Sequence, residues 1–366
     1  MSSYLSPRQY STQSLPEKIP VGIVGATGMV GRRFAELLAD HPYFRVEALT
    51  ASSRSTGRMY VDIATERGHQ VPQSLAFRQI EDLSGVTRGR VRLIFSAFEG
   101  SKEEIIETES ELARRGFMVV SNNSAHRWTP DVPMLMPEVN ADHLALLETQ
   151  ASWQEARGGI VVKPNCSIQS FVPVLKAWEK FGIKNVHVVT EQAISGAGKT
   201  FSEWPEMVDN VIPHIGGEEQ KTETEPLKIL GPNGKPINRE EYPISAICTR
   251  VAASDGHMAN VFVEFEHQPS REELIAALEC YNNPLDGMNL PSSPEKFLTY
   301  THDPDRPQTR LDRDTGHGMS VTVGRLGQKG KGKWSFTGLS HNTLRGAAGG
   351  AVLTAELLQK KGYLQP

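Results

Sequence analysis

Short apolar runs and amphipathic segments alternate along the first third of the chain. Residues 21–24 form an apolar run that leads into a glycine-rich turn, and apolar residues then recur at helical spacing from 34 to 38 until Pro42 stops the pattern. A second strand is predicted over residues 45–50. Strand, glycine turn, helix and strand in this order indicate a βαβ unit of the type that binds dinucleotides.

The same alternation continues as far as residue 181. Strands are predicted over residues 91–97, 117–121 and 159–162, and a helix with acidic residues in its first turn over 101–115. Residues 166–181 carry one amphipathic helical pattern. Alternating strands and helices favour a parallel sheet covered by helices.

Beyond residue 181 the predicted strands are longer and the helices fewer. Strands are expected over residues 186–193, 244–251, 259–266, 320–326 and 334–339. The alanine-rich segment 341–361 is predicted to be helical and to pack back on the first part of the chain. The fold class is therefore α/β: a Rossmann-type dinucleotide-binding domain plus an α+β domain with a mostly antiparallel sheet.

These patterns also suggest domain limits. We expect a flexible N-terminal extension over residues 1–18, a dinucleotide domain over 19–165 completed by 341–366, and a catalytic and dimerisation domain over 166–340. The extension is Ser-rich and has no acidic residue before Glu17, so a short organellar transit peptide stays an alternative to a simple polar tail.

Composition narrows the class of partner. The chain has 366 residues and a net charge of −4, which gives no general field for nucleic acid or an anionic membrane, and no apolar stretch approaches the length of a membrane span. Small molecules are the expected partners. Three widely spaced cysteines fit neither a disulfide framework nor a zinc site, so we expect no metal and a reducing, cytoplasmic location.

The glycine-rich turn is the first candidate site. Residues 25–31 read Gly-Ala-Thr-Gly-Met-Val-Gly, a variant of the commoner Gly-x-Gly-x-x-Gly spacing. Backbone N–H groups in such a loop and at the following helix N-terminus can bind a pyrophosphate. Its position between strand and helix favours cofactor binding over a purely structural turn, and the predicted contacts are Gly25, Thr27, Gly28, Met29 and Val30.

The end of the second strand suggests which dinucleotide is bound. A protein that binds NAD usually places Asp or Glu here to hold the ribose 2′-hydroxyl. This chain has Ser52, Ser53 and Arg54, which suit a 2′-phosphate. NADP(H) is therefore predicted over NAD, although Glu47 or another residue could make the distinction instead.

Cys166 is the candidate nucleophile. It follows Asn165, a plausible helix N-cap, so the helix macrodipole is expected to lower the pKa of the thiol and favour thiolate. The alternative is an ordinary buried cysteine, but Cys166 lies at the expected junction between domains, where clefts form. Cys248 and Cys280 are interpreted as structural.

A nucleophilic thiol needs an acid/base partner, and histidine suits that role near neutral pH. His257 stands out among the eleven histidines because it follows a polar turn, seven residues after Arg250. Spacing alone leaves the other histidines open.

Several motifs in order resemble the aspartate-β-semialdehyde dehydrogenase family from about residue 21 to the C-terminus. They are Asn165-Cys166, Gln192, Ser195-Gly196-Ala197-Gly198-Lys199, Gly217-Glu218-Glu219-Gln220-Lys221, Arg250 with His257, the glycine loop, residues 122–127 and His341-Asn342-Thr343-Leu344-Arg345-Gly346-Ala347-Ala348. The segment 303–312, with Arg306-Pro307-Gln308, resembles the fungal and archaeal branch.

The resemblance implies a role for each residue. The Cys166 thiolate would displace phosphate from L-aspartyl-4-phosphate, NADPH would reduce the thioester to the semialdehyde, and His257 would be the acid/base. Gln192 would orient the substrate, Arg250 would pair with the α-carboxylate and Glu218 would hold the α-ammonium. Phosphate would be bound by Lys221 and Arg127 with Asn122 or Asn165, and the cofactor also by Ser96, Ser195, Gly196 and Asn342.

Alternatives remain for these roles. The charged stretch around Glu218 could be a solvated helix face, with Glu219 rather than Glu218 facing the substrate; Arg127 could be a surface residue and Gln192 a core amide. A malonyl-CoA reductase would use the same thioester chemistry, N-acetylglutamyl-phosphate reductase is a more distant relative, and a non-catalytic NADP sensor would need only the glycine loop. The family also implies a homodimer or homotetramer and a place in threonine, methionine, isoleucine and lysine biosynthesis.

Overall fold

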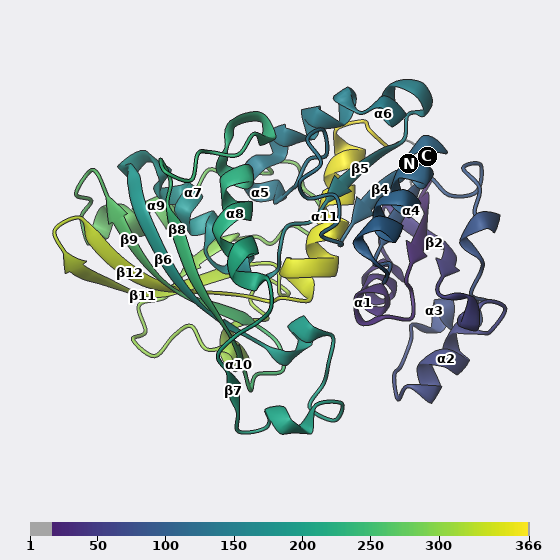
Figure 1. The fold of residues 1–366 in the computed structure, drawn as a ribbon, viewed down its shortest axis with the longest axis horizontal. Helices are drawn as coiled ribbons and strands as arrows, with labels where there is room; N and C mark the ends of the chain where they lie inside the picture. The colour runs from purple at the N-terminus through teal and green to yellow at the C-terminus, as the bar shows by residue number, and fades with distance from the viewer. Residues whose placement is uncertain (1–16, 365–366) are drawn as a thin grey trace, which may run out of the picture.

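The computed structural model describes residues 17–364 and contains two sheets (Figure 1). The predicted N-terminal extension lies almost wholly outside the described residues. Among those residues, no helix is long and apolar enough to cross a membrane.

The first sheet is parallel throughout, as the alternating pattern predicts. Its strand order is β2-β1-β3-β4-β5, and the strands are β1 (Ile19–Val24), β2 (Phe44–Thr50), β3 (Leu93–Ser96), β4 (Met118–Ser121) and β5 (Gly159–Val162). Its helices are α1 (Met29–Leu38), α2 (Tyr60–Glu66), α3 (Gln73–Ala76), α4 (Lys102–Arg114), α5 (Pro137–Asn140) and α6 (Ala151–Ala156). Both faces of the strands are buried, because successive side chains enter different core clusters: Leu93 and Phe95 on one face, Ile94 on the other.

The C-terminal helix α11 (Gly349–Lys360) returns to this first sheet, as predicted. Its apolar side chains share a core cluster with α1 and β1, so a segment more than 300 residues away completes the layer (Figure 1). A π-helical turn, Leu344–Ala348, precedes α11 and joins it to the second sheet.

The second sheet has the order β10-β11-β12-β9-β6-β8-β7. Four of its six neighbouring pairs are antiparallel, which confirms the predicted mostly antiparallel sheet. Its strands are β6 (Ile183–Gln192), β7 (Val211–Ile212), β8 (Ile244–Val251), β9 (His257–Phe265), β10 (Leu298–Tyr300), β11 (Val321–Gly330) and β12 (Lys333–Ser340), and its helices are α7 (Val172–Trp178), α8 (Glu218–Leu230), α9 (Arg271–Glu279) and α10 (Thr309–Asp312). One face packs into the core, whereas Ile247 and Phe262 are exposed on the other.

The helix predicted over residues 166–181 is wrong as a single element. The segment forms a 3-10 turn, Ser167–Ser170, then α7, then a second 3-10 turn, Glu179–Phe181. Phe171 has a φ of −136°, outside the helical region, and Pro173 in the first turn of α7 has no N–H to extend a helix backward. The break turns the residues after Cys166 along the second sheet.

A close approach fixes that turn. A Cβ on Gly338 of β12 would lie 2.0 Å from the carbonyl oxygen of Ser170, so only glycine lets the 3-10 turn rest on the strand.

Gly338→Ala should therefore lower the free energy of unfolding by about 2–4 kcal/mol, because backbone must move to admit the methyl group. Urea denaturation measures this. The matched control is Gly327→Ala on neighbouring β11, where the nearest atom to the new Cβ is 3.7 Å away. Equal stability of the two variants would contradict the argument.

Candidate active site

A cleft of about 350 Å³ lies where the two sheets meet. It collects residues from the glycine loop, the ends of β3, β4 and β5, the loop after β6, α8 and the turn before α11. The predicted site residues that line it are Gly28, Met29, Val30, Asn122, Arg127, Asn165, Cys166, Ser195, Gly196, Glu218, Lys221 and Asn342. Twelve of the predicted site residues therefore lie around one cavity.

The glycine loop has the geometry of a dinucleotide cradle. Gly25 has a φ of +82°, and a Cβ on Gly31 would lie 2.0 Å from the carbonyl oxygen of Gly25, so the loop passes directly over the start of α1. The N–H groups of Gly25 and Ala26 donate to the carbonyl of Thr50, which ties the loop to the end of β2. No side chain caps α1 at Gly28, so its first N–H groups face the cleft and fit a pyrophosphate.

Ser52, Ser53 and Arg54 lie in the exposed turn that follows β2, beside the tied glycine loop. They do not line the cleft. Their contact with a 2′-phosphate stays a prediction, as does the role of Thr27, whose carbonyl accepts a hydrogen bond from Arg67.

Ser96 is placed differently from the predicted cofactor contacts. Its hydroxyl is buried and donates to Oε1 of Glu109 on α4 at 2.7 Å, and the same oxygen accepts from Ser121 and Asn123. This network supports the loop that follows β4, where Asn122 reaches the cleft. Ser96 itself does not line the cleft.

Cys166 follows β5 and faces the cleft where the C-terminal segment passes. A Cβ on Gly346 would lie 2.7 Å from the Cβ of Cys166, so the two main chains are in close contact. Oδ1 of Asn165 accepts from both the N–H and the hydroxyl of Ser167, at 2.7 Å each. Asn165 therefore closes an Asx turn, and the prediction that it is a helix N-cap is wrong, because the N-cap position of the following four-residue 3-10 turn is Cys166.

The expected low pKa of Cys166 is wrong for this structure. Burial, and next the carboxylate of Glu218, raise the pKa of the thiol to about 11, while Arg127 and Arg250 oppose the shift. The first long run of helical hydrogen bonds begins only at α7, six residues later, so the macrodipole that was expected to favour thiolate is absent at this position.

His257 is the first residue of β9 and is fully buried beside the cleft wall. Its Nδ1 accepts from the N–H of Ala193 at 3.1 Å, which places the proton of the neutral ring on Nε2. Nε2 has no partner among residues 17–364, and a Cβ on Gly196 would lie 2.8 Å from it. Burial, with the charge of Arg250, lowers the pKa of His257 to about 3, so the ring is neutral.

Gln192 and Arg250 arrive together because β6 and β8 are parallel neighbours in which these two residues are paired. Both are buried behind the cleft wall. Nη1 of Arg250 donates to the carbonyl of Ala193 at 2.8 Å, and Nε2 of Gln192 lies 3.4 Å from Glu218. Neither lines the cleft, so their substrate contacts stay predictions.

Glu218, rather than Glu219, faces the cleft. Its carboxylate accepts from Nδ2 of Asn165 at 2.9 Å and from Nζ of Lys221 at 2.8 Å. Burial opposes ionisation, but Lys221 and the hydrogen bonds outweigh it, so the pKa of Glu218 is lowered and the group is a carboxylate. Glu219 instead accepts from the N–H of Cys248.

Arg127 is not a surface residue, being only 7% exposed. Its Nε donates to the carbonyl of Lys163 at 2.9 Å and its Nη1 to Glu225 at 2.8 Å. Sequence reasoning gave Glu225 no role in the site, although it lies seven residues, two helical turns, after Glu218 on the same face of α8. That spacing is the signal that could have identified it.

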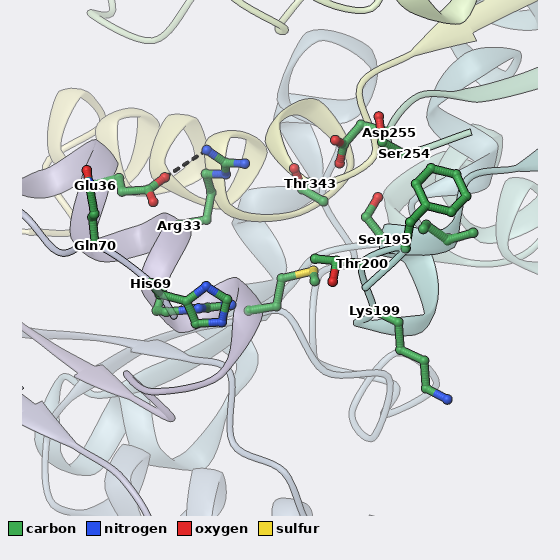
Figure 2. A pocket seen from close by; sticks show the side chains of 14 residues that line it. Arg33, Glu36, His69, Gln70, Ser195, Lys199, Thr200, Ser254, Asp255 and Thr343 are labelled. Carbon is green, nitrogen blue, oxygen red and sulfur yellow. Dashed lines mark hydrogen bonds and ion pairs between the residues drawn. The ribbon is translucent and has the colours of Figure 1, made fainter. Parts of the chain in front are cut away.

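Ser195 and Asn342 line the same cleft as the glycine loop and are hydrogen-bonded to each other. Nδ2 of Asn342 donates to the hydroxyl of Ser195 at 2.8 Å, and its Oδ1 accepts from the N–H of Gly256, the residue before His257. A second cavity of about 380 Å³ shares Met29, Ser195 and Thr343 with the cleft. Arg33 and Glu36 of α1 form an ion pair on one side of it (Figure 2).

Comparison with known proteins identifies this arrangement. The family model "Semialdehyde dehydrogenase, NAD binding domain" matches residues 20–147, and "Semialdehyde dehydrogenase, dimerisation domain" matches residues 173–345. The chain belongs to the semialdehyde dehydrogenase family. The resemblance stated from the motifs is thereby confirmed.

Individual members of the family are similar over nearly the whole chain. An aspartate-semialdehyde dehydrogenase of Archaeoglobus fulgidus is 44% identical, over 93% of this chain and 98% of its own length. A malonyl CoA reductase (NADP) of Metallosphaera sedula is 34% identical, over 94% of this chain and 98% of its own. The solved aspartate semialdehyde dehydrogenase with NADP from Candida albicans has a TM-score of 0.84 at 34% identity, covering 95% of this chain and all 100% of that one.

The charge beside Cys166 gives a test of the site. Removing the Glu218 carboxylate in Glu218→Gln should lower the thiol pKa and speed alkylation of Cys166 by iodoacetamide at pH 8 by about three- to tenfold, since only the thiolate reacts. The exposed Cys280 is first replaced by Ser, so that mass spectrometry follows Cys166. Glu219→Gln, on the other side of α8, is the control, and equal rates in the two variants would refute the assignment.

Proposed function

We propose that the protein catalyses the reversible, NADPH-dependent reduction of L-aspartyl-4-phosphate to L-aspartate 4-semialdehyde and phosphate. The observation that carries this proposal is a cysteine in a cleft that also holds an ionised carboxylate, Glu218, and two cations, Arg127 and Lys221. An amino acid with an activated carboxyl group needs this combination: a thiol for the acyl carbon, an anion for the ammonium and cations for the phosphate.

The covalent step belongs to Cys166. Its thiolate attacks the acyl carbon, phosphate leaves with the electron pair of the broken C–O bond, and a thioester remains. Arg127 and Lys221 stabilise the charge on the leaving phosphate, with Asn122 and Asn165 as further donors. Gln192 and Arg250, behind the wall, are the residues we assign to orienting the acyl group and to the α-carboxylate.

The cofactor is NADP(H), held on the glycine loop with Ser195, Gly196 and Asn342. When bound, it supplies the hydride that reduces the thioester carbon. The residues present fit it, because the start of α1 at Gly28 has no side-chain cap and lines the cleft, and glycines at 25 and 31 allow the tight turn in front of it, where a Cβ would collide with neighbouring backbone.

We assign acid/base catalysis to His257. With Nδ1 accepting from Ala193, the neutral ring carries its proton on Nε2 and can donate a hydrogen bond to the oxygen that becomes negative when the thioester is reduced. Accepting a proton from Cys166 requires the other tautomer, and giving a proton up requires the imidazolium. In both forms Nδ1 carries a proton and loses the hydrogen bond from Ala193.

The ammonium site separates this function from malonyl-CoA reduction. Malonyl-CoA has no amine, so the Glu218 carboxylate would keep only its protein partners, Asn165 and Lys221, and would add no ion pair to the binding of that substrate. Here Glu218 is ionised and aimed into the cleft by Asn165. We therefore favour the amino-acid substrate, in threonine, methionine, isoleucine and, where present, lysine biosynthesis.

The protein contains the family's dimerisation domain. We propose a homodimer, alone or paired into a tetramer, formed by the second sheet, whose open face exposes Ile247 and Phe262. A cytoplasmic location agrees with the free thiols of Cys166, Cys248 and Cys280.

The first functional test follows absorbance at 340 nm with L-aspartate semialdehyde, NADP⁺ and phosphate. NADPH should form only with phosphate present, and Cys166→Ala should lower kcat about a thousandfold or more, because no thioester can form. Cys248→Ala is the matched control and should stay active. Turnover of malonyl-CoA instead would identify the protein as a malonyl-CoA reductase. Binding of NADP without either activity would favour a non-catalytic sensor.

Cofactor choice is tested at Arg54. Arg54→Ala should raise the KM for NADP⁺ about tenfold while the KM for NAD⁺ changes less than about twofold, because only NADP⁺ carries the 2′-phosphate. Arg58→Ala serves as control, since Arg58 pairs with Glu66. Equal losses with both cofactors would show that Arg54 does not read the 2′-phosphate.

A further inference from the structure

Helix α8 presents two carboxylates, two turns apart, to the segment that carries the nucleophile. Glu218 lines the cleft, whereas Glu225 is 1% exposed and lies below it. A carboxylate this deeply buried is costly unless each oxygen has a strong partner. The partners of Glu225 therefore indicate what it does.

Each oxygen of Glu225 has its own partner. Oε1 accepts from Nη1 of Arg127 at 2.8 Å, and Oε2 accepts from the main-chain N–H of Asn165 at 2.7 Å. One side chain thus connects the cation assigned to phosphate with the peptide immediately before Cys166.

The guanidinium of Arg127 is held along two edges. Nε donates to the carbonyl of Lys163, Nη1 donates to Glu225, and Nη2 has no protein partner within residues 17–364. Arg127 lines the cleft, so Nη2 is the nitrogen available to a ligand. One turn further along α8, Nζ of Lys228 donates to the carbonyl of Arg127 at 2.7 Å, so the helix also fixes the main chain of that residue.

We propose that Glu225 is a positioning residue that fixes Arg127 relative to the Asn165–Cys166 peptide, so that phosphate is bound in a set direction from the thiol. This inference rests on the proposed function. An arginine side chain has several rotatable bonds, and holding two edges of its planar group leaves one orientation for the third. Glu225 also offsets the charge of Arg127, which favours release of phosphate after each turnover.

Glu225→Gln is the direct test. Glutamine keeps one oxygen acceptor but presents an NH₂ group to the other donor, so Arg127 or Asn165 loses its partner. We expect the KM for phosphate to rise about tenfold and kcat to fall, with the KM for semialdehyde changing less than about twofold. Glu223→Gln is the control on the same helix, since Glu223 pairs with Arg239 and accepts from the N–H of Ala246 instead.

A double-mutant cycle separates positioning from a general structural role. If Glu225 acts through Arg127, Glu225→Gln should not change the KM for phosphate further in an Arg127→Ala background. Additive losses, or equal losses in both substrates, would overturn the inference. Should Glu225→Gln fail to fold, Glu225→Asp replaces it in the same cycle, with a smaller shift in the same direction expected.

A readout without turnover completes the test. Phosphate should protect Cys166 from iodoacetamide in the wild type, and the half-protecting concentration should rise about tenfold in Glu225→Gln. If phosphate neither protects nor supports activity in the wild type, the proposed function and this inference fail together. If the wild type is protected and Glu225→Gln is protected equally, only the inference fails.

Discussion

The main chain at Asn165 and Cys166 is the point on which the site depends. Gly346, in the turn before α11, packs directly against Cys166, and the carboxylate of Glu225 accepts the N–H of Asn165. Ser170 follows Cys166 by four residues, and its carbonyl lies against Gly338 of β12. These contacts come from α8, β12 and the C-terminal segment, so the nucleophile reaches its position only when both sheets and the returning chain are assembled.

The same enclosure that places Cys166 also opposes its ionisation. Burial and Glu218 raise the pKa of the thiol, and burial with Arg250 lowers that of His257, so the resting pair is neutral thiol and neutral imidazole. A substrate ammonium at Glu218 would offset the charge that disfavours thiolate. On the proposed function, substrate binding rather than a fixed helix dipole makes Cys166 reactive, which limits reaction of the free enzyme with other electrophiles.

Local features of the fold could be predicted from the sequence, whereas features that depend on packing between distant segments could not. The glycine loop, the parallel strands and the return of the C-terminal helix follow from periodicity and spacing, and they are present. The broken helix after Cys166 has one signal in the sequence, Pro173, which the helical periodicity of residues 166–181 outweighed. The Gly338–Ser170 contact that also favours the break joins residues far apart in the chain and cannot be inferred from spacing. The pKa of Cys166 was expected in the wrong direction for a related reason: its burial and its distance from Glu218 are set by tertiary structure.

On the proposed function, the pairing of charges around the cleft agrees with a reaction that runs in both directions. Each cation assigned to phosphate already has a carboxylate from α8: Lys221 pairs with Glu218 and Arg127 with Glu225. Two unpaired cations would bind phosphate tightly and retain it as a product. Because Glu218 and Glu225 lie two turns apart on α8, each cation is paired with a carboxylate and the net charge of the four groups is close to zero. Selectivity for phosphate would then come from the direction of the N–H donors, and its affinity would stay low enough for release. On this proposal, the helix that positions the nucleophile's peptide also sets how firmly the leaving group is held.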